Sequence, residues 1–142
     1  MANRLTKGKG VFGALSVSGP ITAASVASQG LTQTVGTKVS TAINVALVFK
    51  DGVGVTSATA RVHMFYLADD AAGLTPSTVA PDGGIAIGTN GKLIKWTTNL
   101  SGMLISTAAG LCDITVTQST AKNYYLVVVI GGGLSVSSVL AF

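Results

Sequence analysis

The stretch VSTAINVALVFKDG, residues 39–52, decides the fold. Four large apolar residues recur at every second position of this stretch: Ile43, Val45, Leu47 and Phe49. Small or polar residues such as Asn44 and Ala46 lie between them. A period of two predicts a β-strand with one buried face. Asp51-Gly52, followed by Gly54, predicts the turn that closes the strand.

Further strands are expected on the C-terminal side of this one. Alternating or wholly apolar segments separated by turn residues occupy 61–67, 85–87, 93–96, 111–117, 123–130 and 134–142, while 99–109 suits either a short strand or a turn of helix. About seven to eight short strands with turn signals roughly every 8 to 12 residues predict an all-β fold, an antiparallel β-sandwich, with a small barrel as the alternative.

Three details of this sandwich are also predicted. Asn90-Gly91 predicts a two-residue hairpin joining the strands at 85–87 and 93–96. Residues 69–84 carry Pro76, Pro81 and three glycines and predict a long loop that makes contacts. The expected core consists of Ile43, Val45, Leu47, Phe49, Trp96, Ile114, Val116, Val127 and Val129, and in the strand at 61–67 the alternation sets Val62, Met64 and Tyr66 on the apolar face.

Residues 1–37 are expected to form an extended arm, and residues 38–142 the sandwich domain. The arm is rich in Gly, Ser, Thr and Ala without a sustained period, so it cannot build a core of its own, and a disordered tail is the alternative. Within it, 31–35 has the pattern of a short strand that adds to a sheet edge. The residues expected to bind a partner are Arg4, Lys7, Lys9, Phe12, Leu15 and Val17.

Composition favours a subunit of an assembly. The 142 residues suit one domain, yet only 10% are charged and the mean hydropathy is +0.60. No run of about 18 apolar residues is present to cross a bilayer, so we expect no membrane partner. We therefore expect the excess apolar side chains to be buried in contacts with other chains. These contacts predict a homo-oligomer, and a trimer is one candidate.

Charge argues against a nucleic-acid surface on the sandwich. The net charge is +4, and Arg4, Lys7 and Lys9 supply three of these charges, so the remainder of the chain carries +1. Nucleic-acid sites need clustered Lys and Arg. The basic start followed by 11–27 superficially resembles a secretory signal, but Gly13, Gly19 and Pro20 interrupt its apolar part, so no signal peptide is predicted.

Candidate chemical residues are sparse. His63 is the sole histidine and Cys112 the sole cysteine, and both have the pattern of ordinary strand residues rather than of a catalytic base and a nucleophile. Asp69, Asp70 and Asp82 fit turn chemistry better than a calcium loop. Trp96 with Tyr124-Tyr125 could form a sugar platform, but core or interface is the simpler interpretation. We therefore predict no cofactor, no metal and no enzymatic activity.

Three motifs carry a resemblance over about three quarters of the chain: VFKDGVG at 48–54, GTNGKL at 88–93 and GLCDITVT at 110–117. They resemble bacterial immunoglobulin-like repeats of the invasin type and the immunoglobulin-like modules of tailed-phage virion proteins. Invasin-type repeats stand in tandem on long secreted chains, whereas here one module follows a basic arm. This departure favours the phage-type module, which implies an immunoglobulin-like sandwich and a virion location after synthesis in the host cytoplasm.

Three functions follow as hypotheses. The leading one is a non-enzymatic bacteriophage virion structural protein, a capsid decoration or cement protein whose partners are the major capsid protein or other virion subunits. The second is a tail, neck or fibre component that binds a host surface or connects virion parts. The third, from another class, is a small hydrolase that uses His63.

Overall fold

The computed structural model describes residues 30–52, 54–131 and 133–142. This part of the chain contains ten β-strands and no helix. The strands are β1 (Leu31–Val35), β2 (Ala42–Phe49), β3 (Val62–Ala68), β4 (Gly84–Ile87), β5 (Lys92–Thr97), β6 (Ser101–Ile105), β7 (Leu111–Thr117), β8 (Asn123–Ile130), β9 (Gly133–Val136) and β10 (Leu140–Ala141).

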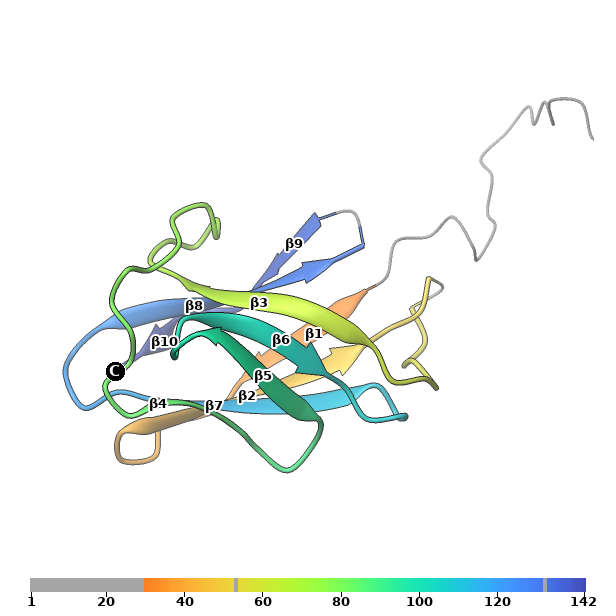
Figure 1. Cartoon of the computed structure of the whole chain (residues 1–142), viewed down its shortest axis with the longest axis horizontal. Coiled ribbons are helices and arrows are strands. Elements are labelled where there is room, and N and C mark those ends of the chain that lie inside the picture. The colour runs from red at the N-terminus through yellow and green to blue at the C-terminus, as the bar shows by residue number, and fades with distance from the viewer. Residues whose placement is uncertain (1–29, 53, 132) are drawn as a thin grey trace, which may run out of the picture.

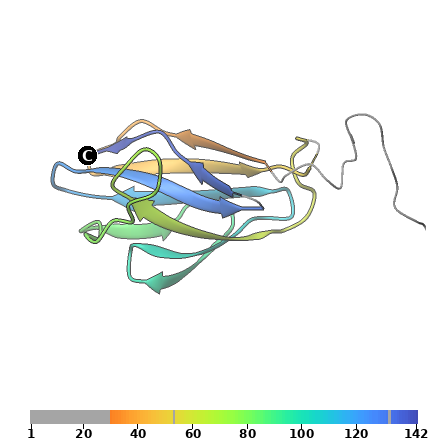
Figure 2. The same cartoon turned by 90° about the horizontal axis from the view of Figure 1, so that it is seen from above.

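The strands form two antiparallel sheets that pack against each other (Figures 1 and 2). The first sheet has the order β1-β2-β7-β4. The second has the order β10-β8-β3-β6-β5, and β9 also pairs with β8. The predicted all-β antiparallel sandwich is confirmed.

The core lies between the inner faces of β2, β7, β3 and β8. Along β2, Ile43, Val45, Leu47 and Phe49 are at most 3% exposed, as predicted. β7 pairs with β2 so that Val45 lies opposite Ile114, and Cys112 and Val116 are buried beside it. Each fully buried aliphatic side chain contributes about 1.5–3 kcal/mol, so this row supplies much of the folding energy.

Two residues expected in the core lie elsewhere. Trp96 is 55% exposed because it lies on edge strand β5, at the irregularity between Lys95 and Thr97 where the β5–β6 register shifts, while Leu93 of the same strand is partly buried against the core and leaves Ile94 on the outer face. Val129 is half-buried on the outer face of β8, opposite Leu134. Val127, also on the outer face of β8, is buried as expected.

The prediction for β3 chose the wrong face. His63, Phe65 and Leu67 point into the core, whereas Val62 and Met64 are 58% and 46% exposed. Both faces of this strand are apolar, so alternation alone could not tell which one the second sheet covers.

The predicted Asn90-Gly91 hairpin is also wrong. β4 pairs with β7 in the first sheet and β5 pairs with β6 in the second, so the segment between them crosses from one sheet to the other. Asn90 donates from its backbone nitrogen and from Nδ2 to Asp113 Oδ2 at 3.0 and 2.7 Å, and Gly91 has a φ of +87°. The dipeptide therefore makes a tight turn, but β7 provides the partner for β4.

The strand number differs from the predicted seven to eight for two reasons. Leu31–Val35 pairs with β2 along its whole length, so the sandwich begins before the predicted boundary at residue 38. The single strand expected at 134–142 is divided into β9 and β10, both paired with β8. The division falls at Ser137, whose hydroxyl accepts from the Leu126 amide and donates to the Ser138 carbonyl. The segment 99–109, which suited either a short strand or a turn of helix, contains the strand β6 at 101–105.

Candidate functional site

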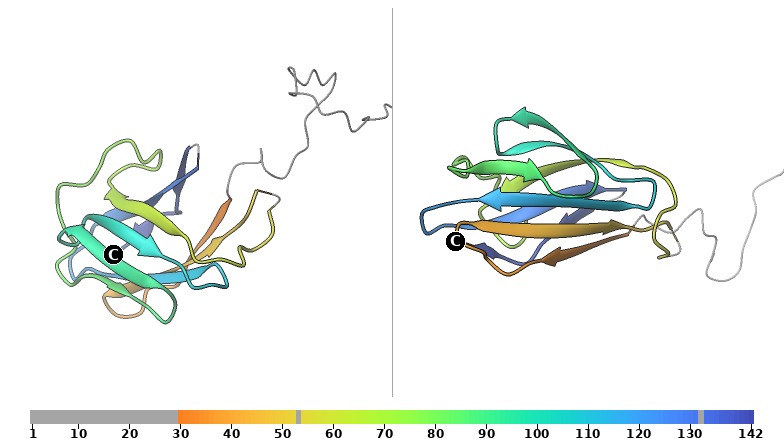
Figure 3. Two further views of the ribbon diagram at one scale, coloured as in Figure 1. Left: turned by 45° about the vertical axis from the view of Figure 1, so that its right-hand side comes forward. Right: turned by 90° about the horizontal axis from the view of Figure 1, so that it is seen from below.

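The outer face of the second sheet carries the largest group of exposed apolar side chains in the described chain. We call it the outer apolar face, and it comprises Val62, Met64, Ile94, Trp96, Met103, Ile105, Val129 and Leu134. Figures 1 and 3 show β3, β6 and β5 side by side in this layer.

The pairing register aligns five of these residues in one row. Leu134 lies opposite Val129, Met64 opposite Met103, and Met103 opposite Ile94. Continuing the β3–β8 register by one residue from Phe65–Val128 sets Met64 beside Val129. The row Leu134-Val129-Met64-Met103-Ile94 therefore crosses five adjacent strands, and side chains of directly opposed residues touch.

The outer face of the first sheet is different in character. Its exposed positions include Thr32, Thr34 and Asn44, and Asn44 Nδ2 lies 3.3 Å from Thr115 Oγ1. Among the described residues, the molecule therefore presents one sheet face whose exposed residues are small or polar and one sheet face with large exposed apolar side chains. An amphipathic sandwich of this kind is suited to contact with a partner through its apolar side.

The loop at 69–83 limits the outer apolar face at one end. Tyr66 donates its hydroxyl to the Gly73 carbonyl at 2.6 Å. A Cβ at Gly73 would lie 2.9 Å from Val127 Cγ2, so the loop backbone packs directly on β8. This contact explains why Val127 is buried while Val129, one step along the same face, is partly open.

Asp70 organises that loop. It accepts hydrogen bonds from the amides of Ala72, Leu74 and Thr75. Desolvation opposes ionisation of this carboxyl, but the hydrogen bonds outweigh it and hold the pKa of Asp70 below its usual value. The predicted turn chemistry of Asp70 is confirmed.

The two other aspartates of this region are also engaged. Asp69 Oδ1 forms an ion pair with Lys122 Nζ at 3.0 Å, and Asp82 accepts from the Ser119 amide at 2.8 Å. No group of three His, Cys or Asp side chains in the described ranges is arranged to hold a metal ion.

His63 is held as a structural residue. Its ring stacks on Phe49 with centroids 4.3 Å apart, and Nδ1 lies 3.1 Å from the Val129 carbonyl oxygen. Desolvation lowers the pKa of His63, with the positive charge of Arg61 adding to the effect and the Val129 contact opposing it. Its Nε2 is buried and has no hydrogen-bond partner among the described residues.

Cys112 is fully buried on β7 between core residues. Burial, with a smaller effect of the Asp113 charge, raises the pKa of the thiol to about 12. The thiolate is the reactive form of cysteine, so Cys112 behaves as a small apolar side chain.

The three aromatic residues weighed as a sugar platform do not come together. Trp96 is on edge strand β5, two strands away from β3, while Tyr124 and Tyr125 are on β8. Tyr124 is buried and donates to the Val79 carbonyl at 3.1 Å. Trp96 belongs instead to the outer apolar face.

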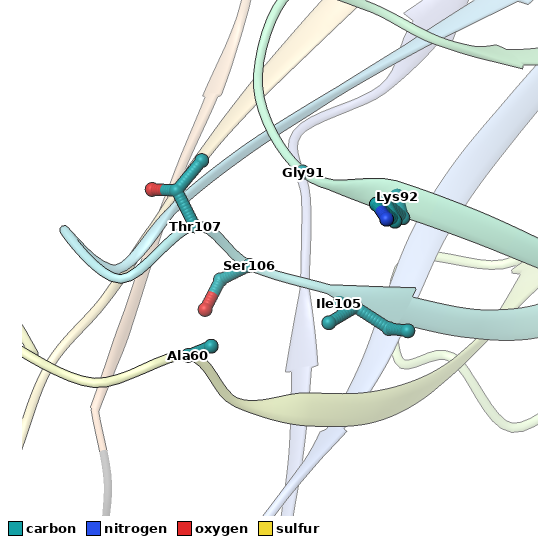
Figure 4. Close-up of a pocket in the computed structure, with 6 residues that line it drawn as sticks. All are labelled: Ala60, Gly91, Lys92, Ile105, Ser106 and Thr107. Atoms are coloured by element: carbon teal, nitrogen blue, oxygen red, sulfur yellow. The ribbon is translucent and has the colours of Figure 1, made fainter.

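A hollow of about 380 Å³ opens at one corner of the outer apolar face, and Figure 4 shows its lining residues Ala60, Gly91, Lys92, Ile105, Ser106 and Thr107. The two hydroxyl oxygens in its lining already accept hydrogen bonds from the backbone: Ser106 Oγ from the Arg61 amide and Thr107 Oγ1 from the Leu111 amide. Ile105 belongs to both surfaces, so the hollow extends the outer apolar face.

The six residues predicted to bind a partner, from Arg4 to Val17, lie outside the described residues. Sequence reasoning missed the outer apolar face itself. The available signal was that 62–67 and 93–96 have large apolar residues on both sides, since a strand at the surface of a two-layer fold needs only one apolar side.

No helix in the described part of the chain is long and apolar enough to cross a membrane. Comparison with models of known families, with curated proteins and with solved structures yields no match.

Proposed function

We propose that this chain is a non-enzymatic structural protein of a bacteriophage particle, a decoration or cement protein of the capsid. The observation that carries the proposal is the outer apolar face, which leaves Met64 and Ile94 almost half exposed beside a polar opposite sheet. Such a surface is expected of a subunit that works by contact.

The strand order supports the immunoglobulin-like part of the proposal. Variable-type immunoglobulin domains have the sheets A-B-E-D and C″-C′-C-F-G. The orders β1-β2-β7-β4 and β5-β6-β3-β8-β9/β10 have the same antiparallel neighbours. Two connections differ, because β4, at the position of D, directly follows β3, and β6, at the position of C′, directly precedes β7.

The mechanism needs no bond chemistry. Copies of the sandwich lie across joints between shell subunits, and the basic arm with Arg4, Lys7 and Lys9 anchors them on neighbouring subunits. A ligand that binds only the assembled state stabilises that state by mass action, so each added contact makes the separation of subunits more costly.

The arm is tested by deleting residues 2–29 and measuring sedimentation of purified chain with particles prepared without it. Full-length chain is expected to cosediment, and the truncated chain to bind at least tenfold more weakly with an unchanged circular dichroism spectrum. The matched control for charge is a triple variant, Arg4→Ala, Lys7→Ala, Lys9→Ala. Its loss of binding relative to the full-length chain should be smaller at high salt, because salt screens the charges that the variant lacks. Unchanged binding of the truncated chain rules out the arm as anchor.

A tail, neck or fibre component is the second candidate. The long loop at 69–83 exposes Leu74 and Val79 at 76% and 53%, which favours a further contact at that end of the sandwich. Copy number separates the two roles, because a component of this kind is present in a few copies at one vertex.

A further inference from the structure

We infer that the outer apolar face is the interface of a two-fold symmetric dimer, in which the second sheets of two copies pack face to face. The inference deepens the proposed assembly role by naming the surface and its partner, a second copy of this chain. It rests on that proposed role only for its biological purpose, because the surface belongs to the sandwich alone.

The apolar area of this face fits a dimer interface. The five most exposed members, Val62, Met64, Ile94, Trp96 and Leu134, are 44% to 58% exposed, and Val129, Met103 and Ile105 are partly open. An aromatic side chain such as Trp96 carries about 150–250 Å² and the aliphatic members carry less, so the face offers on the order of 500 Å² of apolar surface. A standard interface buries about 800 Å² per partner, and in homodimers about 65% of it is apolar. The face therefore matches one side of a stable homodimer.

The order of residues across this face fits two-fold symmetry. A two-fold interface must be complementary to itself, so that residue i contacts j and j contacts i. Met64 stands in the middle of the row Leu134-Val129-Met64-Met103-Ile94, with two apolar residues on each side. A two-fold axis at Met64 brings Ile94 of one copy to Leu134 of the other, and apolar side chains meet along the whole row.

The distribution of charge on this face is also compatible with a dimer. The row contains no charged residue, so joining two copies brings no like charges together at its centre. Lys92 lies opposite Ile105 at the β5 corner. In the two-fold dimer the β5 corner of one copy faces β9 of the other copy. The two Lys92 side chains therefore lie far apart at the rim of the interface, where solvent reaches them.

The edge of the sheet is a poorer site for joining two copies. β5 pairs with β6 and leaves its other side open within the described chain. Lys92 and Lys95 are exposed along this strand, and lysines on an edge strand discourage the addition of another strand. Packing of the two faces, about 10 Å apart, buries the exposed side chains without using that edge.

The first test is the mass of the purified full chain by sedimentation equilibrium. We expect twice the chain mass of 14.2 kDa for the wild type, and the single-chain mass for Met64→Glu with unchanged circular dichroism, because Met64 faces outward. Asn44→Glu is the matched control on the outer face of the first sheet and should remain dimeric.

The second test locates the axis by cysteine cross-linking. Cys112 is inaccessible, so cysteines introduced by Met64→Cys and Asn44→Cys are the reactive thiols within the described sandwich. Oxidation should link Met64→Cys chains into dimers and leave Asn44→Cys chains single. An equimolar mixture of Ile94→Cys and Leu134→Cys chains should link more readily than either variant alone.

Any of four results overturns the inference: a monomeric wild type at about 100 μM, a trimer, a dimer that survives Met64→Glu, or cross-linking at Asn44→Cys instead of Met64→Cys. A monomer whose binding to particles is lost on Met64→Glu would assign the face to a shell subunit. Both tests use purified chain, so their failure leaves the arm-deletion assay to judge the proposed function independently.

Discussion

Val45 is enclosed between the two sheets with no exposed surface, opposite Ile114. A Val45→Lys substitution buries an ammonium group without a partner, which costs several kcal/mol, a large share of the about 5–15 kcal/mol that stabilises a typical domain. We expect loss of the β-sheet circular dichroism signal at 25 °C. The control is Asn44→Lys, one residue away on the exposed side, which should fold; folding of both variants would contradict the assignment of the core.

His63 makes stability depend on pH near neutrality. Desolvation holds its pKa below 6.5 in the folded chain, so the unfolded chain binds the proton more readily. The stabilisation is therefore complete above about pH 6.5 and is lost as the pH falls from 6.5 toward the folded pKa.

The predicted consequence is a lower melting temperature at pH 5.5 than at pH 7.5. His63→Phe, which keeps a ring against Phe49, should show a smaller difference between the two pH values. Hydrogen bonds hold the pKa values of Asp70 and Asp82 below the usual 3.8, so these two carboxylates stay ionised over this interval. Equal pH dependence in the two proteins would show that His63 is not the titrating group.

At the scale of elements, Asp113 on β7 holds the segment that crosses between the sheets, because its Oδ2 accepts both hydrogen bonds from Asn90. Asp113→Ala leaves these donors without their acceptor, at a cost of about 1–3 kcal/mol. For a chain of this size the melting temperature should fall by about 3–9 °C. Thr115→Ala, two residues along the same face, is the control and should change it by less than half as much.

The sequence predicts a strand when the strand's own residue pattern determines it, and fails where contacts between residues distant in sequence decide. β2 and β7 were predictable because one side of each strand carries a continuous row of apolar residues, such as Val45 and Ile114, whereas the other side is interrupted by small or polar residues, such as Asn44 and Asp113. β3 and β5 were not, since Met64 and Trp96 lie on strands that are apolar on both sides. Asn90-Gly91 predicted its turn, but the choice of β7 as partner depends on contacts distant in sequence.

At the scale of the whole molecule, the sandwich encloses a core on one side of its second sheet and leaves apolar side chains on the other. The sequence carried this information as its mean hydropathy of +0.60, which predicted contact with other chains but no location for it. The location depends on register, because Met64 joins Met103 and Ile94 in a row only after β3, β6 and β5 have paired.

The copy number of this chain per particle tests the central proposal most directly. Quantitative mass spectrometry of purified particles, with peptides from this chain and from the major shell subunit, measures it. A decoration protein predicts a ratio of the same order as the shell subunit, with copies spread over the shell in electron micrographs. A few copies at one vertex, or absence from the particle, would contradict the account.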